Sequence, residues 1–366
     1  MKIICLQENL KKSLNITQNI IGKNLTLPIL NNLLLKTEKG RLKISSTNLE
    51  IGINTWTPGK IEKEGEITCP AKILSNLINS LPNKKIELEA RENTLNIKCE
   101  NYKASLNCLS ANDFPIIPQT KQDVIFRVDS SLFRGAMSQV IGLSSLFESR
   151  PEITGVFIKI EKKDIKMVAT DSFRLGERVV FDIEKKDENS HSLIIPQKTA
   201  QELVRILNEE SGQLSVAAES NQVFFNIGNT QIISRLIDGQ YPDYQQIIPN
   251  KFNITTIVDR EEIINNIKIA GLFSNKSSII KIVLRANKFE ILSQDPDLGE
   301  NKSQVEAEIK GPPISINLNY RFLIDGLNNI KTKKIFFGFN SDSTPVIIKP
   351  DGDDSYLYLI MPIKNN

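Results

Sequence analysis

Apolar residues recur along the chain with two kinds of spacing, one typical of helices and one typical of strands. A helical spacing over residues 6–21, ended by Gly22, is followed by alternating positions such as Leu42 and Ile44, which predict strands. A second helical stretch, residues 73–81, leads into three further alternating strands. The first part of the chain therefore predicts an α+β unit of roughly 120 residues, an ordinary domain size.

The same order of elements occurs twice more, which indicates a repeat. Pro70 and Pro196 stand before the second helix of the first two copies, and Asn319 takes this place in the third. The first two copies end in similar segments, in which an aromatic-Pro pair precedes an Ile-Ile-Pro, as at Tyr241-Pro242 and Pro249. The predicted fold is α+β, with three tandem copies of two helices against antiparallel sheets. The predicted domains are residues 1–119, 120–248 and 249–366.

Composition places the chain among ordinary globular proteins. Of its 366 residues 40% are hydrophobic and 24% charged, and no run of 18 apolar residues predicts a membrane span. The N-terminus has no signal-peptide pattern, and the four cysteines form no C-x-x-C pair. We interpret the cysteines as small buried hydrophobic residues in a reducing cytoplasm. The formal net charge of +3 gives no global basic field, so binding to nucleic acid would depend on local placement of Lys and Arg.

The sequence offers no set of catalytic residues. The single histidine, His191, follows a polar turn, where it is better read as a solvated loop residue than as a general base. Gly22-Lys23 lacks the preceding glycine and following hydroxyl of a phosphate-binding loop. The acidic segments at 295–300 and 351–354 lack the ligand spacing of calcium loops, and no metal motif is present. We therefore expect a binding protein, not an enzyme, with no cofactor and no metal.

Basic residues occupy repeated positions on the predicted helices. Lys72, Lys198 and Arg321 each stand two residues into the second helix of a copy. Copies arranged around an axis would present these cations on one face, as suits contact with phosphates without base reading. Further cations lie on or near the companion helices or loops, namely Lys23, Arg134, Arg150, Arg205 and Lys268. The alternative is that these side chains only make the helix surfaces hydrophilic and have no binding role.

A second candidate surface is apolar. It would combine residues after one strand, residues of the second exit segment and the end of the chain, namely Thr170, Phe173, Leu175, Pro242, Ile247, Leu359, Met361 and Pro362. The adaptable Met361 suits a peptide-binding groove. The alternative is that the apolar C-terminus is only a core strand.

Four segments together carry a resemblance to a known family. They are Thr26-Leu27-Pro28-Ile29-Leu30-Asn31-Asn32-Leu33-Leu34-Leu35, Ala169-Thr170-Asp171-Ser172-Phe173-Arg174-Leu175, Asp238-Gly239-Gln240-Tyr241-Pro242-Asp243-Tyr244 and Met361-Pro362-Ile363. In this order they resemble the bacterial DNA polymerase sliding clamps, the β subunits of the replicative polymerase III holoenzyme. The resemblance covers the whole chain.

The resemblance implies a non-catalytic ring. Two subunits would join head to tail, first domain against third, around duplex DNA that is held topologically and without sequence preference. A clamp loader would open and close the ring, and replicative and other DNA polymerases would bind by short peptides in a groove, which confers processivity.

The same resemblance assigns individual residues. The groove would contain Ile153, Thr170, Ser172, Phe173, Arg174, Leu175, Pro242, Ile247, Val346, Leu359, Met361 and Pro362. The subunit contact would involve Ala104 and Leu106 on an edge strand, with Leu272 and Phe273 on the third domain. Asn24, beside Lys23, stands where the family usually has a DNA-contacting Arg.

Two departures from the family pattern affect these expectations. Phe173 replaces a polar ring common in the family, so groove preferences would shift. The chain is slightly basic where many members are acidic, so DNA would be held with more salt dependence. Besides the clamp, a monomeric interaction scaffold that keeps the groove remains an alternative, ahead of an unknown enzyme.

Overall fold

The computed structural model describes residues 1–22, 27–120, 122–147, 149–186, 189–274 and 277–364. Lys23, Asn24 and Thr26 lie outside the described residues. The chain divides into two compact units. The N-terminal unit comprises Met1–Arg134, Asp182–Glu188 and Lys198–Leu236, and the C-terminal unit comprises Gly135–Phe181, Asn189–Gln197 and Ile237–Asn366.

Two antiparallel sheets form the N-terminal unit. The five-stranded sheet has the order β5 (Lys60–Lys63), β1 (Lys2–Leu6), β7 (Lys85–Arg91), β8 (Thr94–Cys99) and β9 (Tyr102–Asn107). The nine-stranded sheet has the order β14 (Glu184–Lys185), β10 (Phe126–Asp129), β16 (Gln213–Glu219), β17 (Gln222–Ile227), β18 (Thr230–Arg235), β4 (Ile51–Pro58), β3 (Arg41–Thr47), β2 (Asn32–Glu38) and β6 (Glu66–Pro70).

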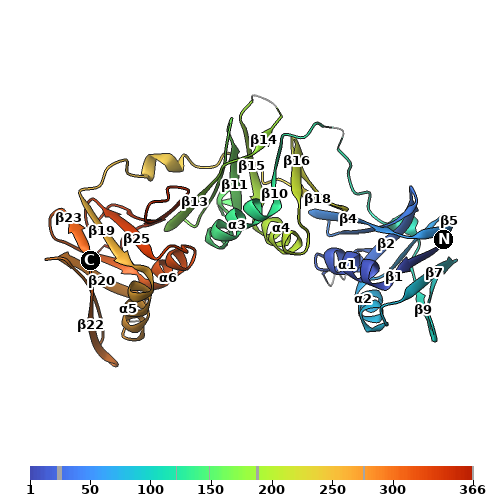
Figure 1. The fold of residues 1–366 in the computed structure, drawn as a ribbon, viewed down its shortest axis with the longest axis horizontal. Helices are drawn as coiled ribbons and strands as arrows, with labels where there is room; N and C mark the ends of the chain where they lie inside the picture. The colour runs from blue at the N-terminus through green and yellow to red at the C-terminus, as the bar shows by residue number, and fades with distance from the viewer. Residues whose placement is uncertain (23–26, 121, 148, 187–188, 275–276, 365–366) are drawn as a thin grey trace. The chain divides into compact units, whose positions relative to one another are not determined.

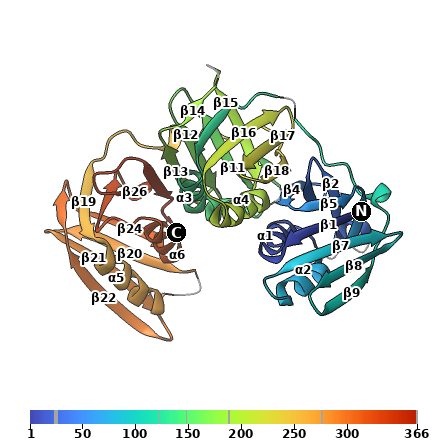
Figure 2. The ribbon, with the colours of Figure 1, turned by 45° about the vertical axis from the view of Figure 1, so that its right-hand side comes forward.

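Helices cover these sheets through their apolar faces. Helix α1 (Gln7–Gln18) packs on β3 and β4 and lies beside α2 (Ala71–Ser80), as Figures 1 and 2 show. Their buried faces join one core, which includes Leu10, Leu14, Leu74 and Ile78. The first residue of helix α4 (Gln197–Glu209) belongs to the C-terminal unit, and the rest of the helix belongs to the N-terminal unit. Burial of these faces supplies most of the helices' stability, since short helices are marginal alone.

The C-terminal unit also contains two antiparallel sheets. One has the order β15 (His191–Pro196), β11 (Gly155–Ile160), β12 (Ile165–Thr170), β13 (Arg174–Val180), β27 (Tyr356–Ile360), β26 (Val346–Pro350), β25 (Lys334–Phe339), β19 (Ile254–Asp259) and β23 (Glu308–Lys310). The other has the order β22 (Gly299–Glu306), β21 (Lys288–Asp295), β20 (Ile279–Arg285) and β24 (Ile314–Asn319).

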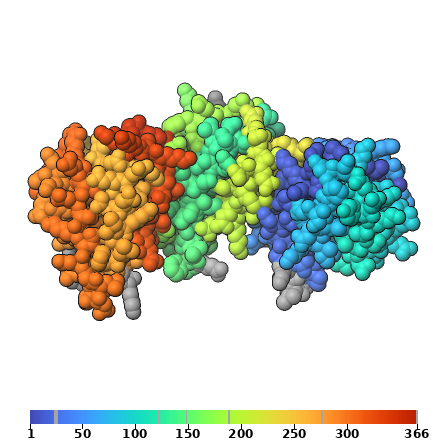
Figure 3. Space-filling model, turned by 60° about the horizontal axis from the view of Figure 1, so that its bottom comes forward, coloured from blue at the N-terminus to red at the C-terminus, as the bar shows by residue number. Residues whose placement is uncertain are grey.

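Helices α5 (Arg260–Leu272) and α6 (Tyr320–Asn328) pack against each other, and α5 covers β21 and β22. In the space-filling view of Figure 3 the residues of β21 and β22 belong to the orange part of the surface. Both helices begin with a side-chain cap, because Asp259 and Asn319 accept hydrogen bonds from first-turn N–H groups. Helix α3 (Ser130–Val140) crosses the unit boundary. Five short 3-10 helices complete the described elements, at Pro28–Asn31, Ala111–Asp113, Ile141–Leu143, Pro151–Ile153 and Tyr244–Ile247.

The order of elements confirms an α+β fold with three tandem copies. Among the described residues each copy has one strand, a helix, five strands, a second helix and three strands. The second helices start directly after Pro70, Pro196 and Asn319, as the sequence predicts. Successive copies are joined by continuous sheets, through the pairing of β4 with β18 and of β13 with β27. The first helix differs slightly from its prediction, because α1 ends at Gln18 and not at Gly22.

The cysteines behave as the composition indicates. Cys5, Cys69, Cys99 and Cys108 are all buried and free. Burial raises the pKa of the Cys5 thiol to about 12, and it raises the pKa of Cys69 well above its usual value. These thiols therefore act as small core residues. No helix in the described part of the chain is long and apolar enough to span a membrane.

Candidate functional site

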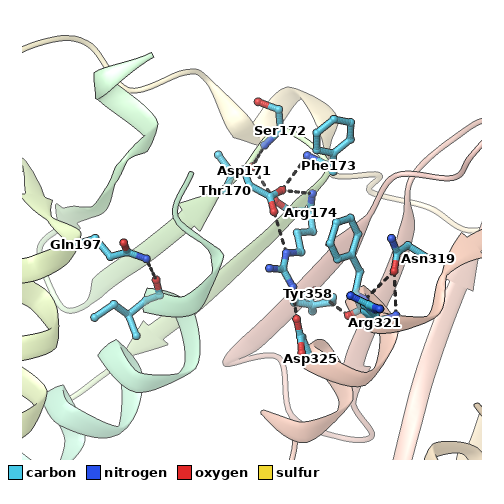
Figure 4. A network of polar contacts seen from close by, with 12 residues as sticks. Thr170, Asp171, Ser172, Phe173, Arg174, Gln197, Asn319, Arg321, Asp325 and Tyr358 are labelled. Atoms are coloured by element: carbon cyan, nitrogen blue, oxygen red, sulfur yellow. Dashed lines mark hydrogen bonds and ion pairs between the residues drawn. The ribbon is translucent and has the colours of Figure 1, made fainter. Parts of the chain in front are cut away.

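A tight turn between β12 and β13 carries the centre of the predicted groove. The Thr170 hydroxyl donates to the Arg174 carbonyl at 2.7 Å and accepts from the Ser172 N–H at 3.1 Å. The Asp171 carboxylate accepts from the N–H groups of Phe173 and Arg174, each at 3.0 Å. Ser172 has a φ of 77°, a left-handed conformation that these bonds hold in place. Figure 4 shows that the turn presents Phe173 outward, and this residue is 58% exposed.

Arg174 is directed away from this exposed surface. Its guanidinium donates to Asp171 at 2.9 Å, pairs with Asp325 on α6 and lies over the Phe322 ring at 4.5 Å (Figure 4). Burial lowers the pKa of Arg174, but Tyr358 and the two carboxylates outweigh this, so the net pKa lies above its ordinary value. The side chain is 13% exposed. Arg174 is therefore a positioning residue that ties the turn to α6.

Replacing Arg174 with Ala should lower the free energy of unfolding by about 2–3 kcal/mol, because two charge-assisted contacts of a mostly buried cation are lost. Chemical denaturation followed by circular dichroism would measure this. The matched control is Lys310→Ala, because Lys310 forms an exposed pair with Glu308 on β23. That control should change stability by no more than about 0.5 kcal/mol, and equal effects of the two substitutions would contradict the positioning role.

An apolar cluster lies beneath the turn. It includes buried Ile153, Leu175 and Leu359, with the half-buried Met361 packed against it. The Met361 N–H donates to the Phe173 carbonyl at 2.9 Å, which holds the end of the chain beside the turn. Burial raises the pKa of Tyr241 and of Tyr244 in the same cluster, so both phenols stay neutral.

The predicted groove residues thus divide by exposure. Buried members can form only a floor, and they are Ile153, Leu175, Val346 and Leu359. Exposed or half-buried members can contact a partner directly, and they are Thr170, Ser172, Phe173, Pro242, Ile247, Met361 and Pro362. All of them belong to the C-terminal unit.

Arg150, predicted as a DNA-facing cation, has one contact with the turn and one with the short helix before β11. Its guanidinium pairs with Glu152 at 3.1 Å and approaches the Ser172 hydroxyl at 3.4 Å. The position of Arg150 is therefore beside the predicted groove. No spacing signal in the sequence distinguishes it from the other cations.

The remaining predicted cations have different surroundings. Lys72, Lys198 and Arg321 are each the second residue of a helix and are exposed, as the repeat predicts. Lys268 is exposed on α5. Arg205 is instead engaged within the N-terminal unit, where it donates to the Asn15 and Ile16 carbonyls and pairs with two glutamates of α4. Arg134 is half-buried and donates to Asn208.

The residues predicted for a subunit contact lie at surfaces. Ala104 and Leu106 are half-buried on β9, the edge strand of its sheet. Leu272 ends α5 and is 69% exposed, and Phe273 caps that helix. Strand β22 is an edge strand of the four-stranded sheet, and it was not predicted because Gly299–Glu306 is almost entirely polar.

Within the described residues, no group of three His, Cys, Asp or Glu side chains could hold a metal ion. His191 begins strand β15, not a loop, because it pairs with Ile160 across the sheet.

Comparison with known proteins identifies the family. Models of the DNA polymerase III beta subunit match the chain at residues 1–118 for the N-terminal domain, 127–243 for the central domain and 245–364 for the C-terminal domain. The beta sliding clamp of Synechococcus elongatus is 28% identical over 100% of this chain and 99% of its own length. That of Staphylococcus aureus is 29% identical over 96% of each chain.

Solved structures that resemble this chain belong to the same family. The DNA polymerase III subunit beta of Pseudomonas aeruginosa matches all of both chains with a TM-score of 0.95 at 26% identity. The beta subunit of Thermotoga maritima matches equally completely with a TM-score of 0.92 at 26% identity. The chain therefore belongs to the DNA polymerase III beta-subunit family, the non-catalytic sliding clamps of DNA replication.

Proposed function

We propose that this clamp encircles duplex DNA as a head-to-tail homodimer in the cytoplasm and is opened by a clamp loader. Its clamp domains are residues 1–119, 120–248 and 249–366. Ala104 and Leu106 of one subunit meet Leu272 and Phe273 of the next, with β9 and β22 as the edge strands available for pairing. The observation that carries the proposal is the complete set of three repeats, with an exposed Leu at the end of α5.

Partner proteins bind through a peptide at the Thr170–Arg174 turn. Exposed Phe173 and Ile247 and half-buried Met361 supply an apolar surface above a buried floor. Such a surface suits a short peptide with bulky apolar side chains, because binding removes apolar area from water. Replicative and other DNA polymerases are the partners proposed.

DNA contact is electrostatic and not sequence-specific. Lys72, Lys198 and Arg321 share one position in three repeated helices, which gives every copy a cation at the same place. Dispersed cations of this kind neutralise phosphates without reading bases.

Substitution of Lys72, Lys198 and Arg321 by Ala together tests this role. Each lost phosphate contact should reduce the slope of log K against log salt by about 0.9. The binding of unloaded clamp to a linear duplex should therefore weaken and become less dependent on salt, as fluorescence anisotropy over a salt series would measure. The control is Lys39→Ala, Lys163→Ala and Lys310→Ala together, three exposed strand or turn residues. An identical slope for both triple variants would contradict the assignment.

A further inference from the structure

The N-terminal unit contains a second turn built like the one at the proposed peptide site. The Thr47 hydroxyl donates to the Ile51 carbonyl at 3.0 Å and accepts from the Leu49 N–H at 3.0 Å. The Asn48 side chain accepts from the N–H groups of Glu50 at 3.0 Å and Ile51 at 2.8 Å. Leu49 has a φ of 75°, against 77° for Ser172. Every hydrogen bond of this turn has a counterpart in the Thr170–Arg174 turn.

The neighbouring strands repeat the same arrangement. Ile51 lies opposite Ser234 in the pairing of β4 with β18, as Arg174 lies opposite Ile360 in the pairing of β13 with β27. The Arg235 N–H donates to the Glu50 carbonyl at 3.0 Å, the counterpart of the bond from Met361 to Phe173. Arg235 therefore occupies the place of Met361.

A hollow accompanies this second turn. Its lining includes Leu49, Glu50, Ile51, Ile116, Ile233 and Arg235. Pro115 and Pro118, in the exit segment of the first copy, border it. In the same way Tyr241 and Tyr244 of the second exit segment pack in the cluster beneath the first turn. The hollow thus has the same three parts as the proposed peptide site: a turn, a strand end and an exit segment.

The floor of the hollow is apolar although one position has lost its side chain. Gly52 stands where Leu175 stands in the other copy, and Ile117 fills the space that a Cβ of Gly52 would take, at 2.9 Å. Ile117 in turn packs on buried Phe224 and Ile233. Above this floor Leu49 is 47% exposed and Ile116 is 94% exposed. Exposure of two aliphatic side chains around one hollow is typical of a binding surface.

We propose that this hollow is a second peptide site, which takes a short extended peptide with an aliphatic side chain next to a carboxylate. The inference rests on the proposed function only in taking the Thr170–Arg174 turn as a peptide site. The aliphatic side chain packs on Leu49 and Ile116, and the carboxylate pairs with Arg235.

Charge selects this peptide over the one suited to the first site. Arg235 is exposed at the strand end, whereas the equivalent Met361 is apolar. Glu50 replaces Phe173 and disfavours a ligand with acidic residues on both sides of its aliphatic side chain. One carboxylate beside one aliphatic residue is therefore the matching pattern.

Fluorescence anisotropy with a labelled peptide, Gly-Ser-Ile-Asp-Gly with an amidated C-terminus, tests the proposal on the full-length protein. Ile116→Ser should weaken binding about tenfold through lost apolar contact, and Arg235→Ala about fivefold through a lost exposed ion pair. A peptide with Lys in place of Asp should bind the wild type more weakly than the original peptide does. The Arg235→Ala variant should bind the two peptides with nearly equal affinity. Phe173→Ser, at the first site, should leave binding unchanged.

Because Ile116 is almost fully exposed, its substitution should not alter the thermal unfolding midpoint, which is measured in parallel. Binding that is insensitive to both Ile116→Ser and Arg235→Ala would overturn the second site. So would the absence of saturable binding to the wild type, or its loss with Phe173→Ser alone. Polymerase binding measured on the same variants reports separately on the first site, so that failure of one site is distinguished from failure of the other.

Discussion

Leu272→Glu should convert the protein to monomers at micromolar concentration and abolish its retention on circular DNA. Leu272 is 69% exposed at the end of α5, and the proposed ring buries it against Leu106 of a second subunit. Burial of a leucine side chain contributes about 1.5–3 kcal/mol, and an unpaired carboxylate in its place would cost several kcal/mol more. The dissociation constant of the dimer should therefore rise by about a thousandfold or more.

Sedimentation velocity measures this change directly. Phe181→Glu is the matched control, because Phe181 is 55% exposed in the same unit but belongs to neither proposed contact surface. The control should remain a dimer. If the wild type is itself monomeric at micromolar concentration, or if Leu272→Glu leaves the mass unchanged, the ring is contradicted and a monomeric interaction scaffold becomes the better account.

Phe173→Ser should weaken binding of the cognate replicative polymerase by about tenfold or more without changing the dimer. Phe173 is 58% exposed and is presented by a turn that the side chains of Thr170 and Asp171 hold through hydrogen bonds to the backbone. A rigid aromatic side chain loses little entropy on binding, and its burial contributes about 1.5–3 kcal/mol. Loss of this apolar contact should appear mainly as faster dissociation.

Surface plasmon resonance with immobilised clamp would measure the polymerase affinity. Phe181→Ser removes a ring of similar exposure, 55%, from the other end of β13. It should leave the affinity within about twofold of the wild type. If the two phenylalanine substitutions weaken binding equally, the effect is not local to the Thr170–Arg174 turn and the peptide site is misplaced.

The repeat could be predicted from the sequence because the residues that mark the start of the second helix are recognisable in all three copies. Pro70, Pro196 and Asn319 all precede a helix, although Asn319 achieves this by side-chain capping and the prolines by restricted backbone angles. Strands were missed where polar residues dominate, as in β22, because such edge strands lack a buried face that would impose alternation.

The site could be predicted only in part. Phe173, Ile247 and Met361 were found from their position in the chain and from the family resemblance, and they are accessible. The inward direction of Arg174 could not be predicted, because Asp325 is distant in sequence and only the fold brings the two together. The contacts of Arg150 with Ser172 and of Arg205 with Ile16 could not be predicted either, because the sequence does not show which distant residues the fold brings to a charged side chain.

Retention on closed DNA tests the central claim most directly. The protein is loaded onto a nicked circular duplex by its clamp loader, and the bound fraction is measured before and after the circle is cut once. A topological ring predicts long retention on the circle with little dependence on salt, followed by rapid loss on linearisation. Equal retention on both forms, falling steeply with added salt, would show ordinary phosphate binding and contradict encirclement.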